Sequence, residues 1–188
     1  MAADTLFSAF LKIWIDFLGV LECTRGTGKC TKMFESAPKV MFMGNYAHKL
    51  DPKSRVAIPA GWRVVFGQEV VMLASTYHEY NVLKCFTHES FAQKLNEIRE
   101  RALADGHELG DVDEYIGSIA GNSFVAEVNT QGKLLIPKQQ RDRLRLAEYA
   151  QLVGRTAHFE IWNTEDFAAE NAPKPNKENP LNKKFRML

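Results

Sequence analysis

The sequence predicts an α+β fold that contains the same small β unit twice. The order of residue types over 46–59 returns over 124–137: alternating apolar residues, a polar stretch that begins with Asp51 or Asn129, and an aliphatic run that ends in Ile-Pro. Alternation with a period of two residues is typical of a strand, and the polar stretch is typical of a turn. Proline ends a strand and suits the first turn of a helix. Each copy is therefore expected to form a strand, a turn, a second strand and a short helix.

End signals in the sequence define the elements that follow the first unit. We expect a short helix over 60–66, a hairpin with strands over 69–73 and 80–86 around a turn at 75–79, and a longer helix that ends near residue 104. Thr87 is the expected N-cap of the long helix, because a threonine hydroxyl accepts a hydrogen bond from the first helical turn. The expected apolar stripe of this helix consists of Phe91, Leu95, Ile98 and Leu103.

Elements of the same kinds are expected around the second unit. They are a loop over 105–110, a short helix over 111–119, a helix over 138–146, a hairpin over 151–162 and a closing helix that begins within 163–167. The last stretch has three prolines and five Lys or Arg against one Glu, which is typical of a solvated basic tail. The expected segments are an N-terminal extension (1–40), a first repeat (41–104), a connector (105–121), a second repeat (122–171) and a disordered basic tail (172–188).

Residues 1–40 share no pattern with the two units. Large apolar side chains are frequent over 6–21, but Lys12 and Asp16 interrupt a stretch that a transmembrane helix would keep apolar for about 20 residues. No basic residue precedes the apolar stretch, so it lacks the start of a signal peptide. We expect an amphipathic helix here, followed by a linker over 24–29 that resembles a phosphate-binding loop only weakly.

Composition limits the classes of function. Apolar residues make up 45% and charged residues 25% of the 188 residues, which is ordinary for a globular protein. The formal net charge is +1, so a nucleic-acid site must be a local cluster of cations. Three scattered cysteines favour reduced thiols in a cytoplasm.

No catalytic or metal-binding pattern emerges from the sequence. The five histidines have no metal-ligand spacing, and neither a nucleophile elbow nor a glycine fingerprint is present. Cys85 lies in an apolar strand, where a free cysteine behaves as a small buried hydrophobe. Asp51 is a poor candidate for an acid catalyst because its counterpart, Asn129, cannot do that chemistry. A role for both side chains in shaping their turns explains the pair better. We expect no enzyme activity, cofactor, metal or small-molecule substrate.

Cations gather around both predicted turns. Those near the first turn are Lys49, Lys53, Arg55 and Arg63, and those near the second are Lys133, Lys138, Arg141, Arg143 and Arg145. Any single one of them is best explained as solvated surface. However, a cation stands at the same place in both copies, at Arg55 and at Lys133. Two matched cations on rigid hairpins are suited to adjacent phosphates or base edges, so double-stranded DNA is the expected partner.

The stretch 41–60 resembles the start of MraZ proteins, the bacterial transcriptional regulators of the division and cell wall gene cluster. The resemblance extends over 41–167 and includes both motif copies. It implies the swapped-hairpin β-barrel of the AbrB and SpoVT type with flanking helices, in which the two copies form an intramolecular pseudo-dimer. It also implies a ring-like homo-oligomer that binds tandem repeats in the promoter of its own operon, as a repressor, in the cytoplasm and associated with the nucleoid. No membrane partner is expected.

The family motif is Asp-x-x-x-Arg, usually with Gly before the Arg. The first copy matches at Asp51 and Arg55 with Ser54 in the glycine place; the second has Asn129 and Lys133 but keeps Gly132. Lysine cannot make the bidentate fork that arginine makes to guanine, so the halves are expected to read DNA unequally. The expected DNA-binding residues are Arg55, Lys53, Lys49, Lys133, Arg63, Lys138 and Arg141, and the turn-shaping residues are Asp51, Ser54, Asn129 and Gly132.

Other interpretations stay open at this point. An AbrB-type antitoxin usually carries one motif copy, so the duplication argues against it, and a non-DNA assembly protein could use the same fold. MraZ chains typically begin Met-Phe-x-Gly, as 41–44 does here. Residues 1–40 are therefore expected to derive from an upstream start codon, or else to form a helix that packs on the ring or on a membrane surface.

Overall fold

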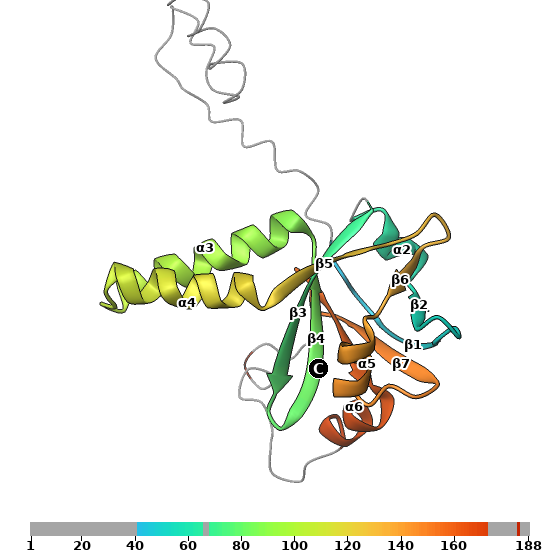
Figure 1. Cartoon of the computed structure of the whole chain (residues 1–188). Helices are drawn as coiled ribbons and strands as arrows, with labels where there is room; N and C mark the ends of the chain where they lie inside the picture. Colours follow the sequence, from blue (N-terminus) through green and yellow to red (C-terminus); the bar gives the residue numbers. More distant parts are fainter. Residues whose placement is uncertain (1–40, 66–67, 173–183, 185–188) are drawn as a thin grey trace, which may run out of the picture. The chain divides into compact units, whose positions relative to one another are not determined.

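The computed structural model describes residues 41–65, 68–172 and 184 of the chain (Figure 1). The elements discussed below belong to one compact unit, Lys39–Leu188. The predictions for the N-terminal extension, and most of those for the basic tail, lie outside the described residues. Within the described ranges, no helix is both long and apolar enough to span a membrane.

The described part of the chain has a mixed α+β fold, as predicted. In chain order its elements are β1 (Asn45–Lys49), β2 (Arg55–Ala57), α2 (Ala60–Arg63), β3 (Glu69–Tyr77), β4 (Tyr80–Phe86), α3 (His88–Ala104), α4 (Leu109–Gly121), β5 (Ser123–Glu127), β6 (Lys133–Leu135), α5 (Lys138–Arg143), β7 (Tyr149–Gly154), β8 (Phe159–Asn163) and α6 (Thr164–Glu170).

The strands form a six-stranded antiparallel sheet in the order β1-β7-β8-β4-β3-β5 and a two-stranded sheet of β2 and β6. The two halves of the chain exchange strands. β1 of the first half pairs with β7 of the second, whereas β5 of the second half pairs with β3 of the first. β2 and β6 then pair with each other across the halves. Neither repeat therefore forms its sheet alone, and the two share one core.

The core lies between the sheets and includes the aliphatic run that closes each β unit. Val56 and Ile58 of the first unit, and their counterparts Leu134 and Ile136 of the second, are at most 1% exposed. These inward side chains anchor the two-stranded sheet on the larger one. Because successive strand residues point to opposite faces, their neighbours on β2 and β6 point outward. Burial of one face therefore defines the other as the exposed face that carries Arg55 and Lys133.

Side-chain caps start helices α3 and α6. Thr87 Oγ1 accepts a hydrogen bond from Ser90 N at 2.9 Å, and Ser90 Oγ accepts one from Thr87 N at 3.0 Å, which completes a capping box for α3. Asn163 Oδ1 accepts hydrogen bonds from the first-turn amides of α6. The predicted cap at Thr87 is therefore confirmed.

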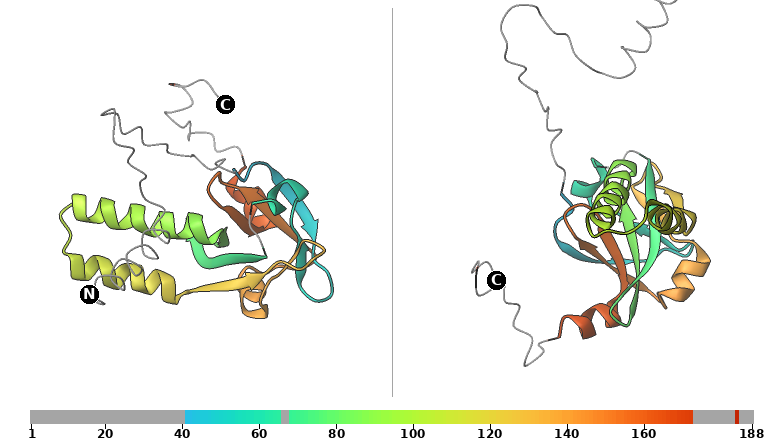
Figure 2. Two further views of the ribbon diagram at one scale, coloured as in Figure 1. Left: turned by 90° about the horizontal axis from the view of Figure 1, so that it is seen from above. Right: turned by 90° about the vertical axis from the view of Figure 1, so that its left-hand side faces the viewer.

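Helices α3 and α4 form an antiparallel arm that projects from the sheets, on the side away from the β1–β2 and β5–β6 loops (Figure 1 and Figure 2). Val112 and Ile116 of α4 are buried, and Arg99 Nη1 of α3 lies 2.5 Å from Asp113 Oδ1 of α4. Leu103 is 41% exposed, so the apolar stripe of α3 ends before this residue and the prediction was wrong there.

Several element boundaries differ from the predicted ones. The hairpin turn predicted over 75–79 is tighter, because β3 continues to Tyr77 and only two residues separate it from β4. His78, the first of them, has φ of +51°, as two-residue hairpin turns require. The connector helix begins at Leu109 rather than at 111. Helix α5 ends at Arg143 rather than at 146, because Arg145 takes φ of +53° and stops the helix.

Candidate nucleic-acid interface

Two turns, residues 51–54 and 129–132, have the same hydrogen bonds, and we call them the paired turns. Asp51 Oδ1 accepts from Lys53 N at 2.9 Å and from Arg55 N at 3.0 Å. Asn129 Oδ1 accepts from Gln131 N at 3.1 Å and from Lys133 N at 2.9 Å. These are Asx turns, in which one side-chain oxygen replaces a backbone acceptor. A neutral amide therefore builds this turn with the same bonds as a carboxylate.

Each turn has one residue with positive φ, Ser54 at +58° and Gly132 at +73°. Glycine takes this conformation without steric cost, whereas serine is disfavoured there by about 1–2 kcal/mol. Ser54 has a compensating contact, because its Oγ accepts a hydrogen bond from Arg141 Nη1 at 2.9 Å. Arg141 belongs to α5 of the second half, so this bond crosses between the halves.

The paired turns are fixed by reciprocal contacts across the halves. Ile58 N donates to Gly132 O at 2.9 Å, and Ile136 N donates to Ser54 O at 3.0 Å. Arg63 lies directly over Gly132, where its Nε donates to Ile58 O at 2.7 Å. The helix that follows each β unit therefore supports the turn of the other unit. Arg63 and Arg141 stand at matching intervals after Arg55 and Lys133, which was the sequence signal for this arrangement.

Gly132→Ala is expected to destabilise the protein by about 1–2 kcal/mol, because an L residue is strained at this φ. Its Cβ would also overlap the Arg63 side chain. Gly61→Ala is the matched control, since no atom lies within 4 Å of its Cβ position and alanine favours a helix. Urea unfolding of both variants measures the effect. Equal stability of Gly132→Ala and wild type would contradict the predicted strain.

The cations of the two turns meet at one carboxylate. Arg55 and Lys133 are diagonal neighbours on the outer face of the β2–β6 ladder, in which Ala57 is the register partner of Lys133. Arg55 Nε and Nη2 both lie 2.8 Å from Asp51 Oδ2, and Lys133 Nζ lies 3.5 Å from the same oxygen. The hydrogen bond from Arg55 holds the pKa of Asp51 well below its ordinary value, despite the opposing effect of desolvation. Asp51 is thus ionised at neutral pH.

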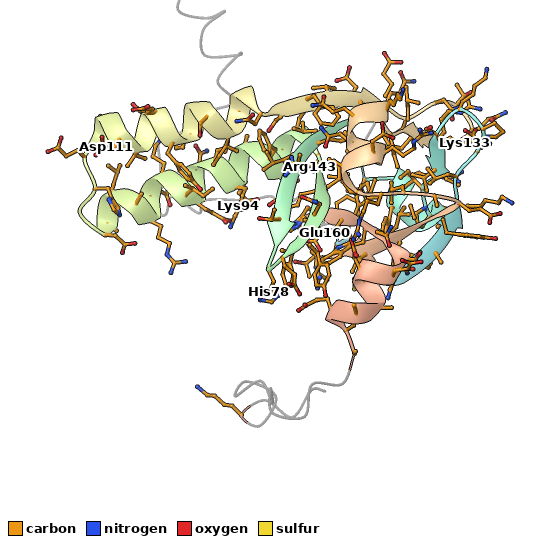
Figure 3. All side chains as sticks on the ribbon, turned by 60° about the horizontal axis from the view of Figure 1, so that its bottom comes forward. His78, Lys94, Asp111, Lys133, Arg143 and Glu160 are labelled. Atoms are coloured by element: carbon orange, nitrogen blue, oxygen red, sulfur yellow. The ribbon has the colours of Figure 1, made fainter. Side chains whose placement is uncertain are left out.

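The other predicted cations differ in their exposure and in their ion-pair partners. Lys53 and Lys138 are exposed, and Lys49 Nζ pairs with Glu148 Oε1 at 2.6 Å. Lys133 stands at the opposite end of the unit from Asp111 on the helical arm (Figure 3). Lys133 and the turn contacts that surround it therefore lie at the end of the compact unit away from the helical arm.

Arg143 and Arg145, which the sequence placed around the second turn, lie elsewhere. Arg143 Nε lies 3.3 Å from Asn81 Oδ1 on β4, and Arg145 Nη2 pairs with Asp166 Oδ1 on α6 at 2.5 Å. Figure 3 separates Arg143 clearly from Lys133. Helical rotation is the reason, because α5 turns residue 143 away from the face that carries residue 141. This part of the predicted cluster was wrong.

The remaining chemistry of the described residues is sparse. No group of three or more His, Cys, Asp or Glu side chains in the described ranges is arranged to hold a metal ion. Burial raises the pKa of the Cys85 thiol well above its ordinary value, which disfavours the reactive thiolate. The paired turns are therefore the strongest candidate site in the described part of the chain.

The sequence of the chain is similar to that of known proteins. A transcriptional regulator MraZ from Leuconostoc citreum is 28% identical over 134 residues, which cover 70% of this chain and 87% of the relative. MraZ of Thermomicrobium roseum is 27% identical over 130 residues, covering 69% of this chain and 87% of the relative. The chain is a homologue of the MraZ transcriptional regulators. The resemblance stated from the sequence is therefore confirmed.

Two other comparisons add little to the MraZ similarity. No family model matches the sequence. The solution structure of PHS018 from Pyrococcus horikoshii covers 64% of this chain and 88% of its own at 14% identity, with a TM-score of 0.29. That score is too low to support an argument about fold, so the MraZ relatives stand as the informative comparison.

Proposed function

We propose that the chain is a transcriptional regulator that binds double-stranded DNA sequence-specifically through the paired turns. The observation that carries the proposal is the outer face of β2 and β6, where Arg55 and Lys133 are diagonal neighbours on a ladder whose inner face is buried. A two-stranded β-ribbon fits the major groove of B-DNA, where arginine recognises guanine O6 and N7 with two parallel hydrogen bonds. The names of the MraZ relatives point to the same activity.

The residues of this face take different roles in the proposal. Arg55 reads a guanine, while Lys133, with no planar fork, chiefly anchors a phosphate. Lys49, Lys53 and Lys138 contribute phosphate contacts around them. Arg63 and Arg141 support the turns through their hydrogen bonds to Ile58 O and Ser54 Oγ, and add positive charge beside them. The first repeat then specifies sequence, and the second strengthens binding.

The wider assignment follows from the MraZ similarity together with the strand exchange. The exchange of β1 and β5 between the halves supports a swapped-hairpin barrel of the AbrB and SpoVT type, folded as an intramolecular pseudo-dimer. We extend the proposal to repression of the division and cell wall gene cluster from tandem promoter repeats. The protein would then act in the cytoplasm, associated with the nucleoid.

Arg55→Ala tests the readout. Losing a bidentate base contact should cost about 1–3 kcal/mol on the cognate duplex and much less on a scrambled one. Lys53→Ala, the matched control, removes an exposed cation from the same turn and should weaken both duplexes alike. The assay is a titration of DNA from upstream of the protein's own gene, and of a scrambled duplex of equal composition, at one stated salt concentration.

The outcomes of this titration separate the rival functions. Equal losses on both duplexes for Arg55→Ala would remove its role in readout. Absence of any preference in the wild type would overturn sequence-specific regulation and favour an assembly protein on the same fold. Binding that requires a second protein would instead favour an antitoxin.

Self-association into a ring is the second part of the proposal. The helical arm exposes apolar side chains, including Leu109 at 55% and Tyr115 at 58%. A groove of about 970 Å³ runs between the arm and β3–β4, with Ile98, Ile119 and Phe124 in its lining. If each arm covers the next chain head to tail, a closed ring results.

Native mass spectrometry at micromolar concentration should therefore show a multimer. Tyr115→Lys should shift the population toward smaller species, because it places a charge in an apolar contact. Asp111→Asn, in the first turn of α4, is the control for charge alone, because it changes the net charge by the same one unit. A strictly monomeric wild type at this concentration would exclude the ring.

A further inference from the structure

The Asp51 carboxylate uses its two oxygens for two different purposes. Oδ1 accepts the amides of Lys53 and Arg55 and so shapes the turn. Oδ2 contacts the side chains of Arg55 and Lys133, which come from different repeats. In the second repeat, Asn129 makes only the turn contacts and brings no charge. One carboxylate thus serves the cations of both repeats.

This contact fixes which edge of the Arg55 guanidinium remains open. Asp51 Oδ2 lies 2.8 Å from Arg55 Nε and 2.8 Å from Nη2, so it occupies Nε–H and one of the two N–H groups of Nη2. Among the described residues, no protein acceptor engages Nη1. The end of the fork, Nη1 with the outer N–H of Nη2, is the edge that forms two parallel hydrogen bonds to guanine. A guanidinium already held by a carboxylate also loses less rotamer freedom on binding.

The same oxygen ties the two repeats together. Without Asp51, Arg55 and Lys133 would be adjacent like charges on neighbouring strands, which repel. With it, they share one anion, with side-chain exposures of 29% and 34% against 17% for Asp51. The anion also has a disadvantage, because a carboxylate beside the cations weakens their attraction to any phosphate backbone.

We propose that Asp51 is a positioning residue that determines sequence specificity by orienting the Arg55 fork and holding Lys133 of the other repeat. This inference rests on the proposed DNA-binding function. It implies that Asp51 raises discrimination between sequences while lowering affinity for DNA in general. A residue that only shapes the turn would not affect these two quantities in opposite directions.

Asp51→Asn isolates this role. Asn129 shows that an asparagine builds the same turn in this protein, so the variant keeps the Oδ1 acceptor and loses the charge on Oδ2. We expect affinity for the scrambled duplex to rise, and the ratio of affinities for the upstream and scrambled duplexes to fall by about five-fold or more. Glu148→Gln is the matched control, since it removes a carboxylate 2.6 Å from Lys49. It should raise both affinities and leave the ratio unchanged.

The outcomes decide between the inference and its rivals. If Asp51→Asn raises both affinities with an unchanged ratio, Asp51 is merely a nearby negative charge and the inference is overturned. If both affinities fall together, its role is structural and the inference is again overturned. If the wild type itself fails to discriminate, the proposed function fails, which is a result that depends on no Asp51 variant.

A measurement on the free wild-type protein needs no variant. The held guanidinium predicts an Arg55 Nε–H resonance that is protected from solvent exchange at neutral pH, because Nε donates to Asp51 Oδ2 at 2.8 Å. Rapid exchange of Arg55 Nε–H, equal to that of an unpaired surface arginine, would overturn the inference.

Discussion

Phe42→Ala is expected to lower the free energy of unfolding by about 3–5 kcal/mol, the usual cost of truncating a buried phenylalanine. Phe42 is 1% exposed, and its ring centroid lies 5.7 Å from that of Trp62 and 5.5 Å from that of Phe159. Its backbone exchanges hydrogen bonds of 2.8 and 3.0 Å with Thr156. The cavity would lie between the two halves of the chain, so neither half could fill it by relaxing alone.

Met43→Ala is the neighbouring control, because Met43 is 61% exposed. Guanidinium unfolding followed by tryptophan fluorescence measures both variants, since Trp62 reports directly on the site. A loss below about 1 kcal/mol for Phe42→Ala would show that the surrounding rings close the cavity.

The second large effect concerns acid stability and the carboxylate of Glu160, which is 3% exposed. Burial would raise its pKa, but the neighbouring His158, Arg155 and Trp162 outweigh burial and lower the pKa from 4.5 to about 2. Trp162 Nε1 and Arg155 Nε each donate to Glu160 Oε2 at 2.9 Å. His158 Nε2, at 3.6 Å from Oε1, is close enough for an ion pair but not for a hydrogen bond.

Because the pKa of Glu160 is lower in the folded state, this carboxylate stabilises the protein fully above about pH 4.5 and loses that effect as the pH falls toward 2. The difference corresponds to about 3 kcal/mol. Glu160→Gln should therefore be less stable than wild type at pH 7, and the two proteins should converge near pH 2.

Denaturant unfolding from pH 7 down to pH 2 checks this expectation. Glu100→Gln, which removes an exposed carboxylate from α3, controls for net charge. A constant difference between Glu160→Gln and wild type at every pH would mean that packing, rather than ionisation, explains the loss.

Local features of this protein follow from its sequence because the interactions that form them span only a few residues. The aliphatic runs that contain Val56 and Leu134 predict the second strand of each β unit, and both residues lie buried in strands. The cap at Thr87 depends on a contact with Ser90, three residues away. The duplicated pattern likewise predicts two matching turns, because the side chain of Asp51 or Asn129 bonds only amides that follow it closely along the chain.

The choice of partner across the chain follows only from the tertiary structure. The sequence does not show that β1 pairs with β7, because any antiparallel edge of suitable pattern would satisfy its hydrogen bonds. The sequence groups Arg143 with Arg141, but the two side chains point in different directions from α5 and contact different residues. The meeting of Asp51 with Lys133 is of the same kind, because the register of β2 on β6 creates that contact and the sequence does not show that the two motif copies lie together. Short-range patterns thus determine the elements and the exposed cations of this protein, and long-range pairing decides which of those cations share a carboxylate.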